Sequence, residues 1–186
     1  RVKEKLITKE VAVSRVRPHQ IYESLLKNID PKDVENSLPI SLGLPAGPGA
    51  SCGIAVFTAE KAEELGKKNK KVILVREETS PEDIHGMHYS EGILTSRGGL
   101  TSHAALVARG WGKSCVVGCQ DLTIDKSHKF AKIGDKKIKE GDHITLNGSS
   151  GDIYLGKMRL FQNPLDNTGP LSPVSYTHLT LPTICS

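Results

Sequence analysis

Residues 92–118 read GILTSRGGLTSHAALVARGWGKSCVVG, and this stretch decides the fold. A short apolar run comes first, a tight loop with Gly98 and Gly99 follows, and the segment HAALVAR then has helical spacing. Ser102 is of the type that caps the start of a helix, and Gly110 of the type that ends one. The run KSCVVG after it has the composition of a second strand. The stretch therefore predicts strand, loop, helix and strand, the repeating unit of an α/β fold.

The same alternation extends on both sides of this stretch. Apolar runs at 53–58, 71–76 and 91–95 predict strands, and the charged segment 59–70 predicts an exposed helix. Ser80 before Pro81, with acidic residues in the next turn, predicts a helix start. After residue 120 the pattern becomes short strands joined by Gly-Asp and Asn-Gly turns. We expect one α/β domain over residues 39–160.

The flanking segments differ from this domain. Residues 9–17 and 19–30 carry apolar residues at helical spacing, so we expect residues 1–38 to be a helical linker or the end of a preceding domain. Residues 167–186 contain no charged side chain and three prolines, so we expect the tail 161–186 to be disordered. From about residue 174 onward we expect the amino-acid sequence to be non-native.

Composition excludes several classes of protein. The 186 residues include 25 Lys and Arg against 21 Asp and Glu, a diffuse net charge of +4, and only 3 Phe, 1 Trp and 4 Tyr. This argues against nucleic-acid binding, which uses concentrated charge and aromatic stacking. No apolar run is long enough for a membrane helix or has the form of a signal peptide. Four cysteines without a CxxC pair predict no metal site, and Cys115 and Cys119 are expected to be reduced core thiols in an intracellular protein.

His103 is the residue best placed for chemistry. It falls in the first turn of the predicted helix, after a glycine-rich loop, where free N–H groups and the positive end of the helix dipole favour an anion. A cation is disfavoured there, so we expect a neutral imidazole near pH 7 whose lone pair can attack phosphorus. The alternative is that the glycines only make a turn, Ser102 only caps the helix and His103 is incidental to a non-catalytic anion-binding module.

The stretch from 92 to 119 closely resembles the phosphohistidine motif of the pyruvate, phosphate dikinase family of PEP-utilising enzymes. The similarity continues upstream in TSPEDIHGMH (79–88) and GLPAGPGASCGIAVF (43–57), and it covers roughly residues 5–158. The resemblance implies a swivelling phosphohistidine domain, a compact β/β/α sandwich of short strands with helices on one side.

The resemblance also implies a function. His103 would carry a phosphoryl group that arrives from ATP and phosphate through a nucleotide-binding domain, with release of AMP and pyrophosphate. A C-terminal barrel with Mg²⁺ would then transfer the group to pyruvate, forming phosphoenolpyruvate. The implied phosphoryl-binding loop comprises Arg97, Gly98, Gly99, Thr101 and Ser102. This domain would bind no cofactor or metal itself, would have neither nucleic acid nor membrane as partner, and would not turn over alone.

Several features leave alternatives open. The carrier could instead serve a phosphoenolpyruvate synthase, in which water replaces phosphate as the second acceptor. In plant members of the family the threonine that matches Thr101 is the target of an inactivating phosphorylation.

Arg97 and Arg109 either steer the phosphoryl group or are solvated. His85 and His88 are expected in a loop, and the lysines of 126–139 on a solvated face.

Overall fold

The computed structural model describes residues 25–125 and 127–162, of which 27–161 form one compact unit. An eight-stranded sheet with the order β2-β12-β11-β4-β5-β6-β7-β3 forms its centre. The four strands β4 to β7 run parallel to their successive neighbours, and the remaining pairs are antiparallel. The strands are β2 (Ser41–Leu42), β3 (Leu44–Gly47), β4 (Ala50–Val56), β5 (Val72–Arg76), β6 (Gly92–Thr95), β7 (Ser114–Val117), β11 (His143–Asn147) and β12 (Asp152–Leu155).

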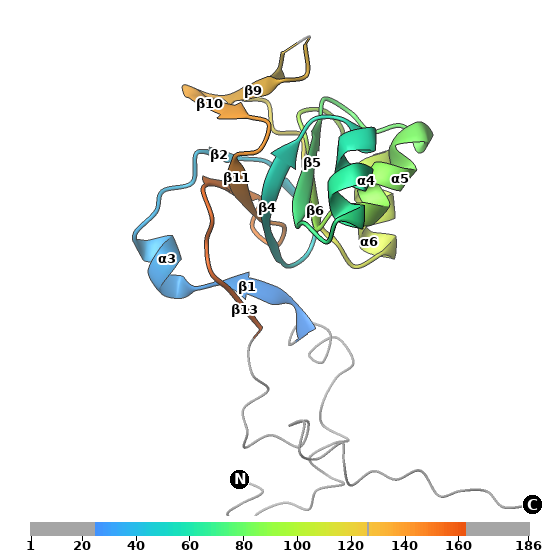
Figure 1. Cartoon of the computed structure of the whole chain (residues 1–186). Helices are drawn as coiled ribbons and strands as arrows, with labels where there is room; N and C mark the ends of the chain where they lie inside the picture. Colours follow the sequence, from blue (N-terminus) through green and yellow to red (C-terminus); the bar gives the residue numbers. More distant parts are fainter. Residues whose placement is uncertain (1–24, 126, 163–186) are drawn as a thin grey trace, which may run out of the picture. The chain divides into compact units, whose positions relative to one another are not determined.

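Three helices connect the parallel strands and lie together on one side of them (Figure 1). They are α4 (Ala59–Lys67), α5 (Ile84–Tyr89), which follows a 3₁₀ turn at Pro81–Asp83, and α6 (His103–Gly110). A small antiparallel sheet packs on the opposite face and consists of β8 (Leu122–Ile124), β9 (Phe130–Ile133) and β10 (Lys136–Lys139). The expected β/β/α sandwich of short strands with helices on one side is confirmed.

Alternation along the parallel strands creates the two halves of the core. In β5, Val72 and Leu74 pack in the cluster on the helix side, whereas Ile73 and Val75 pack in the cluster on the side of the small sheet. All four are at most 2% exposed, because successive side chains of a strand point to opposite faces and both faces are covered here. The apolar run at 71–76 is therefore a central strand, as its composition predicts.

The segment HGMH differs from its predicted structure. The expected helix start is confirmed, since Ser80 and Asp83 form a capping box on the 3₁₀ turn, but His85 and His88 lie within α5 and not in a loop. Gly86 explains the difference, because a Cβ at this position would lie 2.5 Å from the Ala59 Cα of α4. Close packing of α5 on α4 thus overrides the low helix propensity of glycine.

Segments from both ends of the unit pair with each other. Lys27–Ile29 form β1, not the end of the helix expected over 19–30, and β1 pairs with β13 (Leu160–Gln162). Ile29 is buried with Ala50, Tyr154 and Met158, and this burial favours the extended conformation. The helix expected at 9–17, the rest of 19–30 and the tail beyond residue 162 lie outside the described residues.

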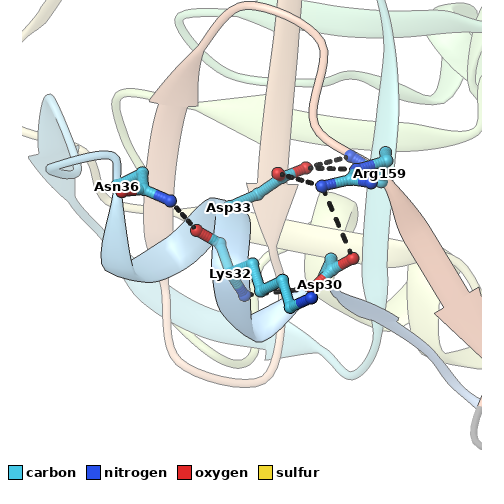
Figure 2. A network of polar contacts seen from close by, with 5 residues as sticks. All are labelled: Asp30, Lys32, Asp33, Asn36 and Arg159. Atoms are coloured by element: carbon cyan, nitrogen blue, oxygen red, sulfur yellow. Dashed lines mark hydrogen bonds and ion pairs between the residues drawn. The ribbon is translucent and has the colours of Figure 1, made fainter.

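Arg159, which directly precedes β13, bonds to the short helix that follows β1 (Figure 2). The helix α3 (Pro31–Glu35) begins at Asp30, whose carboxylate accepts a hydrogen bond from the Lys32 N–H at 3.0 Å. The Arg159 side chain donates to Asp33 at 3.1 Å and lies 3.8 Å from Asp30, and its backbone N–H donates to Asp33 at 2.8 Å. These hydrogen bonds hold the pKa of Asp33 below its usual value of 3.8. Among the described residues, no helix has the length and apolarity needed to cross a membrane.

Candidate functional site

The loop that precedes His103 begins at the carboxyl end of β6, between its parallel neighbours β5 and β7. In open α/β sheets this edge is where ligands bind. The buried Thr95 donates its hydroxyl hydrogen to the Arg97 carbonyl at 2.7 Å, and its own carbonyl accepts from the Cys119 N–H at 3.1 Å. The Arg97 N–H donates to the Glu77 carbonyl at 2.9 Å. The start of the loop is therefore fastened to the segments on both sides.

Ser102 caps α6, as its position in the sequence predicts. Its backbone is extended, and its hydroxyl oxygen accepts a hydrogen bond from the Ala105 N–H at 3.4 Å. Its carbonyl accepts the first helical bond from Leu106 at 3.0 Å, and its N–H donates to the Gly99 carbonyl at 3.0 Å. His103 is consequently the first residue of the helix, at its positive end.

Several backbone donors around His103 have no acceptor within the described part of the chain. They are the N–H groups of Gly98, Gly99, Leu100, Thr101, His103 and Ala104. Such donors in a loop and in the first turn of a helix form the kind of site that binds phosphate. The structure therefore supplies the donors that the sequence predicts.

The imidazole of His103 is only partly exposed. Its Nε2 atom is buried and makes no hydrogen bond within the described residues. A phosphorus atom must approach a ring nitrogen along the direction of its lone pair. Transfer to Nε2 therefore requires the ring to rotate toward solvent first, a feature that nothing in the sequence indicates.

Gly98 and Gly99 differ in backbone conformation and in surroundings, although both are expected in the same phosphoryl-binding loop. Gly98 has a φ of +96°, and a Cβ there would lie 2.8 Å from the Ser102 Cβ. Gly99 has no positive φ, and a Cβ there would meet nothing within 4 Å. Gly98 is thus required by the backbone, whereas Gly99 leaves open space beside the free N–H groups.

The two arginines that flank the motif have different surroundings. The Arg109 guanidinium donates to the Leu100 carbonyl of the loop, and its Nε donates to the Ala105 carbonyl at 3.2 Å. Arg109 therefore links the loop to the helix. The sequence predicts instead that it either contacts the phosphoryl group or is solvated. Arg97 is exposed and borders a pocket of about 420 Å³. The pocket is also lined by Arg76, Glu77, Glu78, Ile124, Asp125 and His128.

The remaining residues that the sequence singles out differ in burial. Cys115 and Cys119 are buried and reduced, and burial raises the pKa of the Cys115 thiol to about 12. Thr101 is exposed. The lysines of β9 and β10 are also exposed, as expected for a solvated face. Across residues 25–125 and 127–162, no three His, Cys, Asp or Glu side chains are grouped as metal ligands.

Comparison with known proteins gives one consistent family. Residues 68–151 match the family described as PEP-utilising enzyme, mobile domain. The chain is 50% identical over 160 residues to pyruvate, phosphate dikinase 1, chloroplastic, of Arabidopsis thaliana, and 54% identical over 161 residues to the pyruvate, phosphate dikinase of Rickettsia felis. These alignments cover 86% and 87% of the chain but 16% and 18% of the relatives, so the chain spans less than a fifth of their length.

A solved structure of an Enzyme I protein is also similar. The match has a TM-score of 0.33 and 25% identity, and it covers 46% of this chain and 30% of that one.

Proposed function

Residues 68–151 match the mobile domain of PEP-utilising enzymes, and on that premise we propose that the chain carries a phosphoryl group on His103 within a pyruvate, phosphate dikinase. The observation that carries the proposal is the position of His103 at the start of α6, beside backbone N–H groups that have no acceptor in the described part of the chain. A nucleophile next to a phosphate-binding loop can both receive a phosphoryl group and stabilise the product.

The chemistry needs one nucleophile and one leaving group. A ring nitrogen of His103 attacks phosphorus of phosphoenolpyruvate, the N–P bond forms, and the P–O bond to the enolate breaks. The enolate then takes up a proton and becomes pyruvate. The loop N–H groups donate to the phosphoryl oxygens, and Arg97 adds a nearby positive charge. In the reverse direction the same groups return the phosphoryl to the enolate of pyruvate.

The proposal assigns the remaining chemistry to other parts of a longer protein. A nucleotide-binding part would supply the phosphoryl group from ATP and phosphate, and a barrel with Mg²⁺ would hold phosphoenolpyruvate or pyruvate. This chain would bind neither ATP nor Mg²⁺, would work inside the cell, and would complete no turnover by itself. A requirement for inorganic phosphate in the complete enzyme would distinguish a dikinase from a phosphoenolpyruvate synthase.

The first experiment is phosphoryl transfer between separate proteins. The chain is mixed with Mg²⁺, labelled phosphoenolpyruvate and the Rickettsia felis dikinase expressed without its own mobile domain. We expect an acid-labile, base-stable phosphoryl adduct on His103 and one pyruvate per adduct. His103→Asn should take up no label. An unlabelled wild-type chain, or the same labelling of His103→Asn, would contradict the proposal.

A further inference from the structure

A pocket of about 440 Å³ lies at the end of the parallel strands that is opposite to the loop before His103. Cys52 lies near the start of β4 and Lys71 directly precedes β5, whereas that loop leaves the carboxyl end of β6. The pocket is therefore separate from the site proposed for the phosphoryl group. Its lining consists of Cys52, Lys71, Lys157, Met158, Arg159 and Leu160.

The base of the pocket is apolar and is held in place by a buried hydroxyl group. Met158 and Cys52 are only 6% and 8% exposed, and Leu160 is partly buried. The hydroxyl of the buried Thr145 on β11 donates to the Gly156 carbonyl at 2.9 Å and accepts from the Met158 N–H at 3.3 Å. Because Thr145 is also the register partner of Cys52 on β4, the segment that carries Met158 is fixed next to Cys52.

The rim of the pocket carries positive charges that the fold leaves largely unbalanced. Lys71 and Lys157 are exposed, and their ammonium groups form neither an ion pair nor a hydrogen bond within the described residues. Arg159 pairs through Nε and Nη2 with the carboxylates at the start of α3, which leaves its Nη1 without a bond in the described part of the chain. The lining includes no carboxylate, in contrast to the pocket beside Arg97. A cleft lined by one sign of charge concentrates ions of the opposite sign.

We propose that this pocket binds a small organic dianion, a phosphate monoester or a dicarboxylate, independently of phosphoryl transfer to His103. A doubly charged oxyanion needs more than one cationic donor, and Lys71, Lys157 and the free Nη1 of Arg159 supply them. The carbon part of the ligand would contact Met158 at the base. An inorganic ion fits less well, because it would exchange water for a thiol and a thioether. The volume of the cavity is in the usual range for small-molecule sites.

The two methionines of the chain make binding directly observable by NMR. Met158 lines the pocket, whereas Met87 is fully buried in the cluster on the helix side of the sheet. The chain is labelled with ¹³C at the methionine methyl groups, and Met158→Leu assigns the two signals. Phenyl phosphate and phthalate are the dianionic probes, benzamide is the neutral probe, and inorganic phosphate is the probe without a carbon part.

We expect one or both dianionic probes to shift the Met158 signal in a saturable manner at millimolar concentrations, while the Met87 signal stays unchanged. The probe that binds more tightly distinguishes a phosphate ester from a dicarboxylate as the ligand. Lys71→Gln and Lys157→Gln should each raise the dissociation constant about fivefold, the effect of losing one exposed charge. The matched control is Lys70→Gln, an exposed neighbour outside the pocket lining, which should bind as wild type.

Each of the following results would overturn the inference. A Met158 signal that neither dianion shifts would exclude the site. An equal shift with benzamide would show an apolar pocket without charge selection, and equal affinity for inorganic phosphate would exclude the organic part of the ligand. An equal loss of affinity in Lys70→Gln and Lys71→Gln would show that the probes respond to diffuse surface charge and not to the pocket.

Discussion

Thr101 and His103 are two residues apart, and the fold gives them different environments. Thr101 is exposed, whereas the Nε2 atom of His103 is buried. The N–H of Thr101 is among the donors without an acceptor in the described part of the chain, so a phosphate on its hydroxyl would lie close to the loop that we propose for the transferred group. The resemblance to plant dikinases implies a regulatory phosphorylation of this threonine, and we propose that role for Thr101, whose exposure is compatible with it.

Charge at Thr101 should control labelling of His103. A phosphothreonine brings a charge of about −1.5 to −2, which would occupy the loop donors and repel the incoming phosphoryl group. Thr101→Glu should therefore abolish labelling by phosphoenolpyruvate, while Thr101→Val should retain most of it. Both rates are measured in the transfer assay, with circular dichroism as the check on folding. Equal labelling of both variants at the wild-type rate would exclude charge at Thr101 as the switch.

The loop between β6 and α6 allows a matched pair of substitutions. Gly98→Val places a β-branched residue at a φ of +96° and in contact with Ser102. We expect it to lower the free energy of unfolding by about 2–3 kcal/mol. Gly99→Val enters open space at an ordinary φ, so the unfolding free energy should change by less than about 1 kcal/mol.

The Gly99→Val variant should lose function although it keeps its stability. The Gly99→Val side chain would occupy the space next to the free N–H groups, so we expect a folded chain that takes up no label on His103. Urea unfolding and the transfer assay measure the two effects on the same preparations. A folded Gly99→Val chain with full labelling would show that the loop is only a connector between β6 and α6.

For the whole molecule, the ion pair between Asp33 and Arg159 links segments that are far apart in the sequence (Figure 2). Hydrogen bonds from Arg159 lower the pKa of Asp33 below 3.8 in the folded chain. A lowered carboxyl pKa stabilises the fold at pH values above the unfolded pKa, and this contribution disappears as the pH falls through the folded pKa. The stabilisation should therefore be complete near pH 6 and absent in strong acid.

Substitution of Asp33 should reveal this dependence. We expect Asp33→Asn to have a lower urea midpoint than wild type at pH 6, with a difference that shrinks steadily between pH 4 and pH 2. Glu35→Gln is the matched control, because Glu35 lies on the same helix but forms no ion pair within the described residues, and it should show little difference. A difference between Asp33→Asn and wild type that stays constant down to pH 2 would contradict the role of the charge.

Features that depend on neighbours along the chain follow from local sequence patterns. The strands at 53–58, 71–76 and 91–95, the helix start at Ser80 and the cap at Ser102 follow from the sequence because hydrophobic patterning and capping involve residues within a few positions of one another. The place of His103 in the first turn of α6 follows from the same local pattern, and so does the loop before it. The resemblance to dikinases rests on this contiguous stretch too.

Features that depend on distant contacts become visible in the folded chain alone. The burial of Nε2 in His103, the Gly86 packing that makes HGMH helical, and the pairing of β1 with β13 all require segments from elsewhere in the fold. The hydrogen bond between Asp33 and Arg159 joins residues 126 positions apart. Such contacts leave no periodic signal in the sequence, because each is formed by a few residues whose meeting depends on how the whole chain packs.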